Sequence, residues 1–158
     1  MHCSMPTGRI SWIITRVYSR YMGEILTALM RWIHLSSVVT LIGGIFYARF
    51  VMTPAGQGLS PDARTALDEG AAGRFRPVVF TAIAGLVLSG IYNFLAKPGH
   101  SVLYHMLFGF KMLLALHVFS VAILVTAPKN PRRARQLFGA AISGLTIILI
   151  SAYLKGIN

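Results

Sequence analysis

Four long runs of apolar residues alternate with short polar segments along this chain. The runs cover residues 32–52, 78–96, 103–127 and 137–154. Crossing a hydrocarbon core of ~30 Å takes about 20 residues of helix, so each run is long enough to span a bilayer. Consecutive spans joined by short connections lie antiparallel. The pattern therefore predicts an all-α integral membrane protein, an antiparallel bundle of four transmembrane helices.

The connections between the spans carry the turn-forming and charged residues. Ser60-Pro61-Asp62 predicts the start of a short helix over 62–69, and Pro77 then marks the start of the second span. Lys97-Pro98-Gly99 predicts a tight turn, and residues 128–135 predict a basic turn. Residues 24–158 thus form one four-helix transmembrane domain.

Residues 1–23 form a basic N-terminal tail with a short apolar patch. The patch, 10–14, is too short for the apolar region of a signal peptide. Two interpretations stay open. The tail could be a basic interfacial helix, or translation could begin at Met22, directly before the first span.

The charge of the chain indicates a lipid partner. The 158 residues include 15 Lys and Arg against 4 Asp and Glu, which gives a net charge of +11. Most of the basic residues lie in segments that flank the spans, which is typical of membrane proteins and argues against nucleic acid as a partner. The single cysteine, Cys3, excludes an internal disulfide.

The distribution of basic residues predicts the orientation. The first and third connections and the span ends beside them hold eight: Arg49, Arg64, Arg74, Arg76, Lys129, Arg132, Arg133 and Arg135. The opposite side holds three, or six with the tail. Since basic segments stay in the cytoplasm, we expect a bacterial-type inner membrane protein with both termini outside.

Polar side chains are rare within the spans, and several share one depth. His34 and His105 lie near the starts of the first and third spans, which run parallel in an up-down bundle. The second and fourth spans end at the same level, where they bring Tyr92, Asn93, Ser151 and Tyr153 beside Tyr104. A polar layer contributed by four helices is how bundles build cofactor or metal sites.

The layer offers ligands for copper or for haem. Met30 precedes His34 by one helical turn, and Met112 follows His105 by two turns. Imidazole with thioether suits copper, whereas two imidazoles from facing helices suit the iron of haem b. A structural interpretation stays open, since histidine and tyrosine also anchor helices at interfaces and methionine fills cores.

Lys111 is the most costly residue of the chain to bury. It lies about 12 Å into the third span, and a lysine at that depth usually marks function. No acid lies in any of the four spans, so its partner must come from a ligand, such as a haem propionate, or from another subunit.

Three further features of the spans favour structural roles. His117 points away from His105 and Lys111, and we expect it to hydrogen-bond to Ser36, Ser37 or Thr40, with a second site as the alternative. Arg49 is expected to anchor to headgroups. Close helix packing is predicted along two rows of small residues: Thr81, Gly85, Ser89 and Asn93, and Gly139 and Ser143.

Several short motifs over residues 30–135 resemble the membrane domain of the copper resistance protein D (CopD) family. They are His34 followed by Gly43-Gly44 and Pro54, then Arg74-Phe75, Gly90-Ile91-Tyr92-Asn93, and Tyr104 seven residues before Lys111. A weaker resemblance links His34, Gly44-Ile45-Phe46-Tyr47 and Lys111 to the HemJ-type protoporphyrinogen oxidases, which are haem-associated. The chain departs from the CopD pattern at Leu41 and His105.

The resemblances imply two of three functional hypotheses. The first is a CopD-like protein that handles copper or binds haem b, with His34, His105, Met30 and Met112 as metal ligands and Asn93, Tyr104 and Lys111 around the cofactor. The second is a HemJ-type oxidase in which Lys111 steers a porphyrin propionate. The third is a non-catalytic subunit of a larger membrane complex. Besides the lipid bilayer, the expected partners are such a complex or a redox partner.

Overall fold

Long helices make up almost all of the described chain. The computed structural model describes residues 7–96, 102–128 and 130–156, and side chains from residue 16 onward. α1 (Thr7–Tyr47) continues through a π-helical turn, η1 (Ala48–Met52), into α2 (Thr53–Ala55) and the 3-10 turn η2 (Gly56–Gly58). The remaining helices are α3 (Pro61–Leu95), α4 (Val102–Val125) and α5 (Arg133–Gly156).

Four of these helices are long and apolar enough to cross a membrane. They are α1 with its continuation, α3, α4 and α5. The shortest, α4 and α5, have 24 residues each, or about 36 Å at the helical rise. Large apolar side chains cover the outer faces: Leu35, Leu88, Leu113 and Leu149 are each more than 60% exposed, as suits contact with lipid. The predicted all-α four-helix fold is confirmed.

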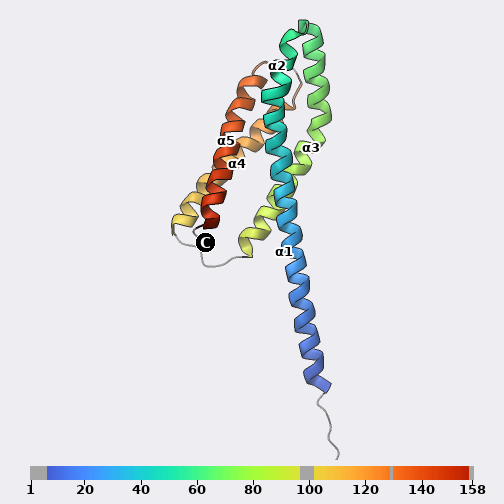
Figure 1. The fold of residues 1–158 in the computed structure, drawn as a ribbon, viewed down its shortest axis with the longest axis vertical. Helices are drawn as coiled ribbons and strands as arrows, with labels where there is room; N and C mark the ends of the chain where they lie inside the picture. Colours follow the sequence, from blue (N-terminus) through green and yellow to red (C-terminus); the bar gives the residue numbers. More distant parts are fainter. Residues whose placement is uncertain (1–6, 97–101, 129, 157–158) are drawn as a thin grey trace, which may run out of the picture.

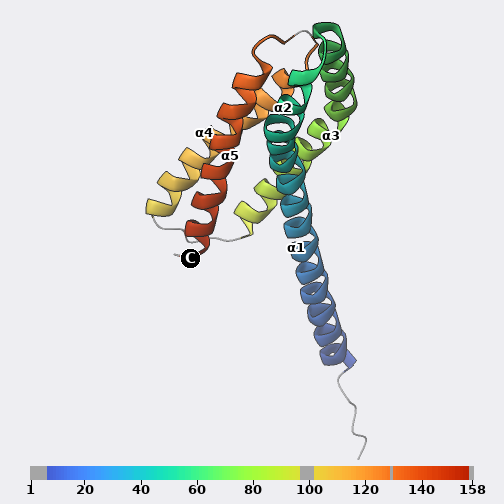
Figure 2. The ribbon, with the colours of Figure 1, turned by 45° about the horizontal axis from the view of Figure 1, so that its top comes forward.

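The bundle consists of two helix pairs that meet near one end. α1 packs chiefly against α3, and α4 packs chiefly against α5. The pairs come together toward the end that carries the first and third connections. Toward the other end α1 separates from α4 and α5, whereas α3 stays in contact with α4 through Phe94 and Phe108 (Figures 1 and 2). The buried apolar core follows this geometry, since it consists of Leu41, Ile45, Val79, Ala82, Val118, Val121, Ala122, Val125, Leu137, Ala140 and Ala141.

α1 extends well beyond the rest of the bundle at its N-terminal end (Figure 1). It runs without interruption from Thr7 to Tyr47, so the described part of the basic tail, residues 7–23, and most of the first span belong to one helix of 41 residues. No helix break separates residues 23 and 24.

α3 corrects the predicted start of the second span. The expected short helix does begin at Pro61, where the Ser60 hydroxyl accepts a hydrogen bond from the Ala63 N–H at 3.4 Å. However, this helix does not end before Pro77, because α3 continues through that proline to Leu95. A proline inside a helix removes one backbone hydrogen bond and bends the axis, and α3 changes direction along its length (Figure 2). The second span is therefore the continuation of the connecting helix.

The π-helical turn η1 lies immediately before Pro54. The Thr53 N–H donates to the carbonyl oxygen of Ala48, and the Thr53 hydroxyl donates to the same oxygen at 2.8 Å. Such wide turns inside helices often lie at functional sites. Here the turn carries Arg49.

Small residues let α1 and α3 approach closely, as predicted. A Cβ atom added at Gly85 would lie 2.5 Å from Oγ of Ser37. Ser89, one turn further along, is completely buried. Thr81 differs from this prediction, because it is exposed and donates to the Pro77 carbonyl of its own helix at 3.0 Å.

Candidate functional site

His34 of α1 is held by Ser89 of α3. The His34 Nδ1 atom lies 2.9 Å from the Ser89 Oγ atom. The serine hydroxyl has one proton, and it donates that proton to the carbonyl oxygen of Gly85 one turn earlier. Ser89 therefore accepts a hydrogen bond from Nδ1–H, which leaves the His34 Nε2 lone pair available to a ligand. A hydrogen bond to the ring nitrogen that does not bind the metal orients metal-binding histidines in this way.

Lys111, in the other helix pair, lies within electrostatic range of the same imidazole. It lies on α4, is partly buried, and its positive charge acts on the His34 ring. In the described parts of the chain, Lys111 forms no ion pair and no hydrogen bond with a side chain. The acids of the sequence, Glu24, Asp62, Asp68 and Glu69, all lie outside the apolar runs. His34, Ser89 and Lys111 together are called the His34 site below.

A second polar contact between α1 and α3 lies next to the His34 site. The Thr27 Oγ1 atom is 3.1 Å from the Tyr92 hydroxyl oxygen. Tyr92 belongs to the predicted polar layer, whereas Thr27 was not singled out from the sequence. The feature of the sequence that could have identified Thr27 is its spacing of seven residues from His34, which places both side chains on one face of α1.

Aromatic side chains join α3 to α4 at the level of the predicted layer. The Phe94 and Phe108 rings stack at a centroid distance of 4.8 Å, and Tyr104 stacks on Phe108 at 6.0 Å. Tyr104 and Asn93 are both partly buried, whereas Tyr153 is 56% exposed. The layer thus contains an aromatic cluster between α3 and α4, and Tyr153 lies on the outside of α5.

The other predicted metal ligands differ from His34 in how far they are buried and in what they contact. Met30 is partly buried and lies one turn from His34 on α1. His105 is exposed, with its ring edge-on to that of Tyr104 at 6.1 Å, and Met112 is 43% exposed. Among the described residues, no group of three or more His, Cys, Asp or Glu side chains could hold a metal ion. The roles of His105 and Met112 as ligands stay predictions.

His117 does not make the contacts expected for it. Its side chain is exposed, and its Nε2 atom lies 3.9 Å from the place where a Cβ atom on Gly139 would be. His117 thus lies beside α5, whereas Ser37 lies against Gly85 of α3. Within the described residues, the predicted hydrogen bond to Ser36, Ser37 or Thr40 is not formed.

Arg49 makes contacts within the bundle, and its expected role as a headgroup anchor stays a prediction. Its guanidinium carbon lies 5.5 Å from the ring centroid of Phe138 on α5 and 5.7 Å from that of Phe50. Its Nε atom is buried and has no hydrogen-bond partner in the described parts of the chain. Arg49, which lies in the π-helical turn, thus makes cation–π contacts with Phe50 of the same turn and with Phe138 of α5.

The sequence could not identify which side chains of different helices contact one another. Ser89 was interpreted as a small packing residue, because nothing in its spacing shows that His34 faces it. The arrangement of the site can hold an electron-pair acceptor at His34 Nε2 and an anionic group near Lys111. In comparisons with protein-family models, curated proteins and solved structures, no match to the chain was found.

Proposed function

We propose that this chain is an integral membrane protein that binds haem b, in which His34 Nε2 would bind the iron and Lys111 would pair with a propionate. The observation that carries the proposal is that two side chains from other helices act on the His34 ring. Ser89 holds Nδ1 on one side, and the charge of Lys111 acts on the ring from another helix pair.

The charge at the site favours a tetrapyrrole over a bare copper ion. A copper ion beside His34 would be repelled by the Lys111 ammonium group, whereas a propionate would be attracted to it. An anion would also compensate a partly buried charge that has no acidic neighbour in the spans. The motifs shared with the CopD and HemJ-type families point to the same residues.

Each residue of the site has a distinct role in this proposal. Ser89 sets the tautomer and orientation of His34, and His34 supplies the ligand atom. Lys111 binds and orients the carboxylate. Haem b bound there would supply one-electron chemistry.

The orientation of the chain is part of the same proposal. The basic first and third connections would lie in the cytoplasm of a bacterial-type inner membrane. The His34 site would then lie toward the outer face, with both termini outside.

An absorption spectrum of the full chain, purified from haem-replete membranes, tests this function. We expect a Soret band with split α and β bands after reduction by dithionite. His34→Ala should abolish these bands, whereas His117→Ala, an exposed histidine on α4, should retain them. The Soret band of His105→Ala reports whether a second imidazole ligates the iron.

Two results would contradict the proposal. Stoichiometric copper without haem, lost in His34→Ala, would favour copper handling. Co-purification with a large partner, with neither cofactor, would favour a structural subunit. If haem is bound, turnover of protoporphyrinogen by the purified chain would identify an oxidase of the HemJ type.

A further inference from the structure

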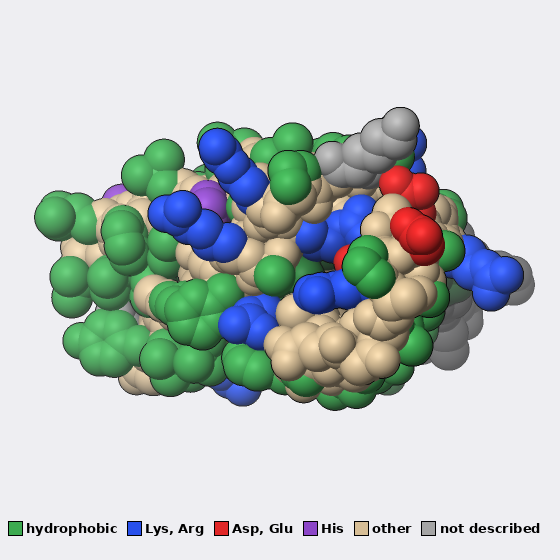
Figure 3. Space-filling model, turned by 90° about the horizontal axis from the view of Figure 1, so that it is seen from above, with side chains coloured by type: hydrophobic (Ala, Val, Ile, Leu, Met, Phe, Trp, Pro, Cys, Tyr) green, Lys and Arg blue, Asp and Glu red, His purple; other side chains and the backbone are tan. Residues whose placement is uncertain are grey.

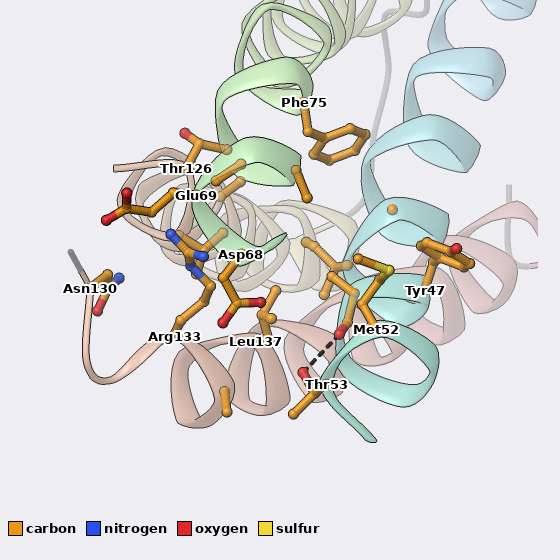
Figure 4. Close-up of a pocket in the computed structure, with 18 of the residues that line it drawn as sticks. Tyr47, Met52, Thr53, Asp68, Glu69, Phe75, Thr126, Asn130, Arg133 and Leu137 are labelled. Carbon is orange, nitrogen blue, oxygen red and sulfur yellow. Dashed lines mark hydrogen bonds between the residues drawn. The ribbon is translucent and has the colours of Figure 1, made fainter. Parts of the chain in front are cut away.

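A pocket of about 620 Å³ lies between the helices at the end where the two pairs meet. All four spanning helices contribute to it, and Figure 4 shows its residues. None of His34, Ser89 and Lys111 lines it, so it is separate from the His34 site. The volume is in the range of pockets that hold drug-sized ligands. We call it the loop-end pocket.

The loop-end pocket has an apolar interior and a polar mouth. Its interior is lined by buried side chains, among them Leu41, Val79 and Ala122. Small residues keep this space open: Gly44, Ala48, Ala71, Ala72 and Ala122. The mouth carries Arg64, Asp68, Glu69, Asn130 and Arg133 from the first and third connections and the helix starts that follow them. This division suits a ligand with an apolar body and a polar head.

Arg133 has hydrogen-bonding capacity that the protein does not use. One of its terminal nitrogens, Nη2, donates to the Ala127 carbonyl oxygen at 3.1 Å. Its Nε atom is buried and has no hydrogen-bond partner among the described residues. A buried donor without a partner is costly, and each such group in a native structure needs an explanation. An anionic head in the pocket would accept from this group.

The mouth itself is balanced in charge, with Arg64 and Arg133 against Asp68 and Glu69, so the unused donor of Arg133 is what favours an anion. Asp68 and Glu69 line the pocket, but in the described chain neither forms an ion pair with Arg133. The first and third connections, with the span ends beside them, carry seven arginines against three acids. Seen from above, basic side chains spread across this face and the acids lie toward one edge (Figure 3).

We propose that the loop-end pocket binds an amphipathic anion. A phosphate or carboxylate head contacts Arg133, and a single apolar chain lies along Leu41, Val79 and Ala122. Guanidinium groups bind both heads through paired N–H donors, and the apolar interior contributes by excluding water from the chain. The inference is independent of haem binding at the His34 site.

Binding of radiolabelled dodecyl phosphate to the full chain in phosphatidylcholine nanodiscs tests the proposal. We expect saturable binding that inorganic phosphate and dodecanol, the head and the tail alone, do not displace. Arg133→Gln should weaken binding at least tenfold. Arg135→Gln, an exposed arginine two residues further along that does not line the pocket, should change it less than twofold.

A second pair of variants tests the apolar part without touching charge. Ala72→Trp narrows the pocket and should reduce binding at least tenfold, whereas Ala66→Trp, exposed on the same helix and outside the lining, should not. Equal binding by Ala72→Trp and Ala66→Trp, or by Arg133→Gln and the wild type, would overturn the proposal. Binding of dodecyl phosphate that does not saturate would also overturn the proposal.

Lipid extraction of the purified protein distinguishes the sources of the ligand. A two-chain phospholipid enriched in the wild type over Arg133→Gln assigns the bilayer as the source, and an enriched single-chain acid assigns a free amphiphile. If Arg133→Gln retains as much anionic lipid as the wild type, Arg133 is not the binding group.

Discussion

The Nδ1 atom of His34 on α1 lies 2.9 Å from the Oγ atom of Ser89 on α3. Ser89 is completely buried, and its own proton goes to the Gly85 carbonyl oxygen, so the serine is held in one orientation. The contact thereby links the first and second spans and fixes which nitrogen of His34 faces outward from α3.

Replacing Ser89 by alanine should release the His34 ring. We expect Ser89→Ala to weaken haem affinity by about 10- to 100-fold, as loss of an outer-shell partner typically does. The loss of one buried hydrogen bond should also lower the free energy of unfolding by about 1 kcal/mol. Haem titration and thermal unfolding in detergent measure the two effects. Ser120→Ala is the control, because Ser120 is exposed and bonds only to the Leu116 carbonyl of its own helix.

Replacing Lys111 by methionine should separate binding from stability. Without the partly buried ammonium group, the cofactor-free protein should become more stable, because an unpaired charge no longer has to be desolvated. Haem affinity should fall by about tenfold or more, since a charge-assisted hydrogen bond contributes about 1.5–3 kcal/mol. Lys155→Met, an exposed lysine at the end of α5, should change neither quantity. Unchanged haem affinity in Lys111→Met would remove this residue from the site.

Two adjacent glycines of α1 should respond oppositely to alanine. A Cβ atom at Gly44 would collide with the Phe75 ring of α3, whereas a Cβ atom at Gly43 would meet nothing within 4 Å. Gly44→Ala should therefore destabilise the protein by about 1–3 kcal/mol, the usual effect of overpacking. Gly43→Ala should be neutral or stabilising by up to about 1 kcal/mol through helix propensity. Equal unfolding curves for the two variants would contradict the close approach of α1 and α3.

The Thr27–Tyr92 contact should contribute modestly to the α1–α3 pairing. Hydrogen bonds between membrane helices average about 0.6 kcal/mol in double-mutant cycles, so we expect a coupling of that size between Thr27→Val and Tyr92→Phe. Unfolding free energies of the wild type, both single variants and the double variant give this coupling. Additive effects would show that the two hydroxyl groups are not bonded.

The helices were largely predictable, but their junctions were not. Turn-forming residues between 53 and 76 predicted a short helix followed by a new one, and Pro77 was interpreted as a boundary. A proline inside a helix is tolerated when neighbouring contacts support the helix, and here α1 packs along α3. Arg49 likewise makes contacts that its place in the sequence does not indicate, because its guanidinium group lies over the rings of Phe50 and Phe138.

The sequence by itself determined that this protein has four helices long and apolar enough to cross a membrane, and that His34 and Lys111 are exceptional within them. Apolar runs of that length must be helical in lipid, because each backbone group has to be hydrogen-bonded within its own segment. Only the tertiary structure decided which polar groups meet: Ser89 with His34, Tyr92 with Thr27, and Arg133 with the loop-end pocket. These contacts depend on the rotation and crossing of each helix. Packing of small residues such as Gly44 and Gly85 sets that geometry, and hydrophobicity along one helix does not encode it.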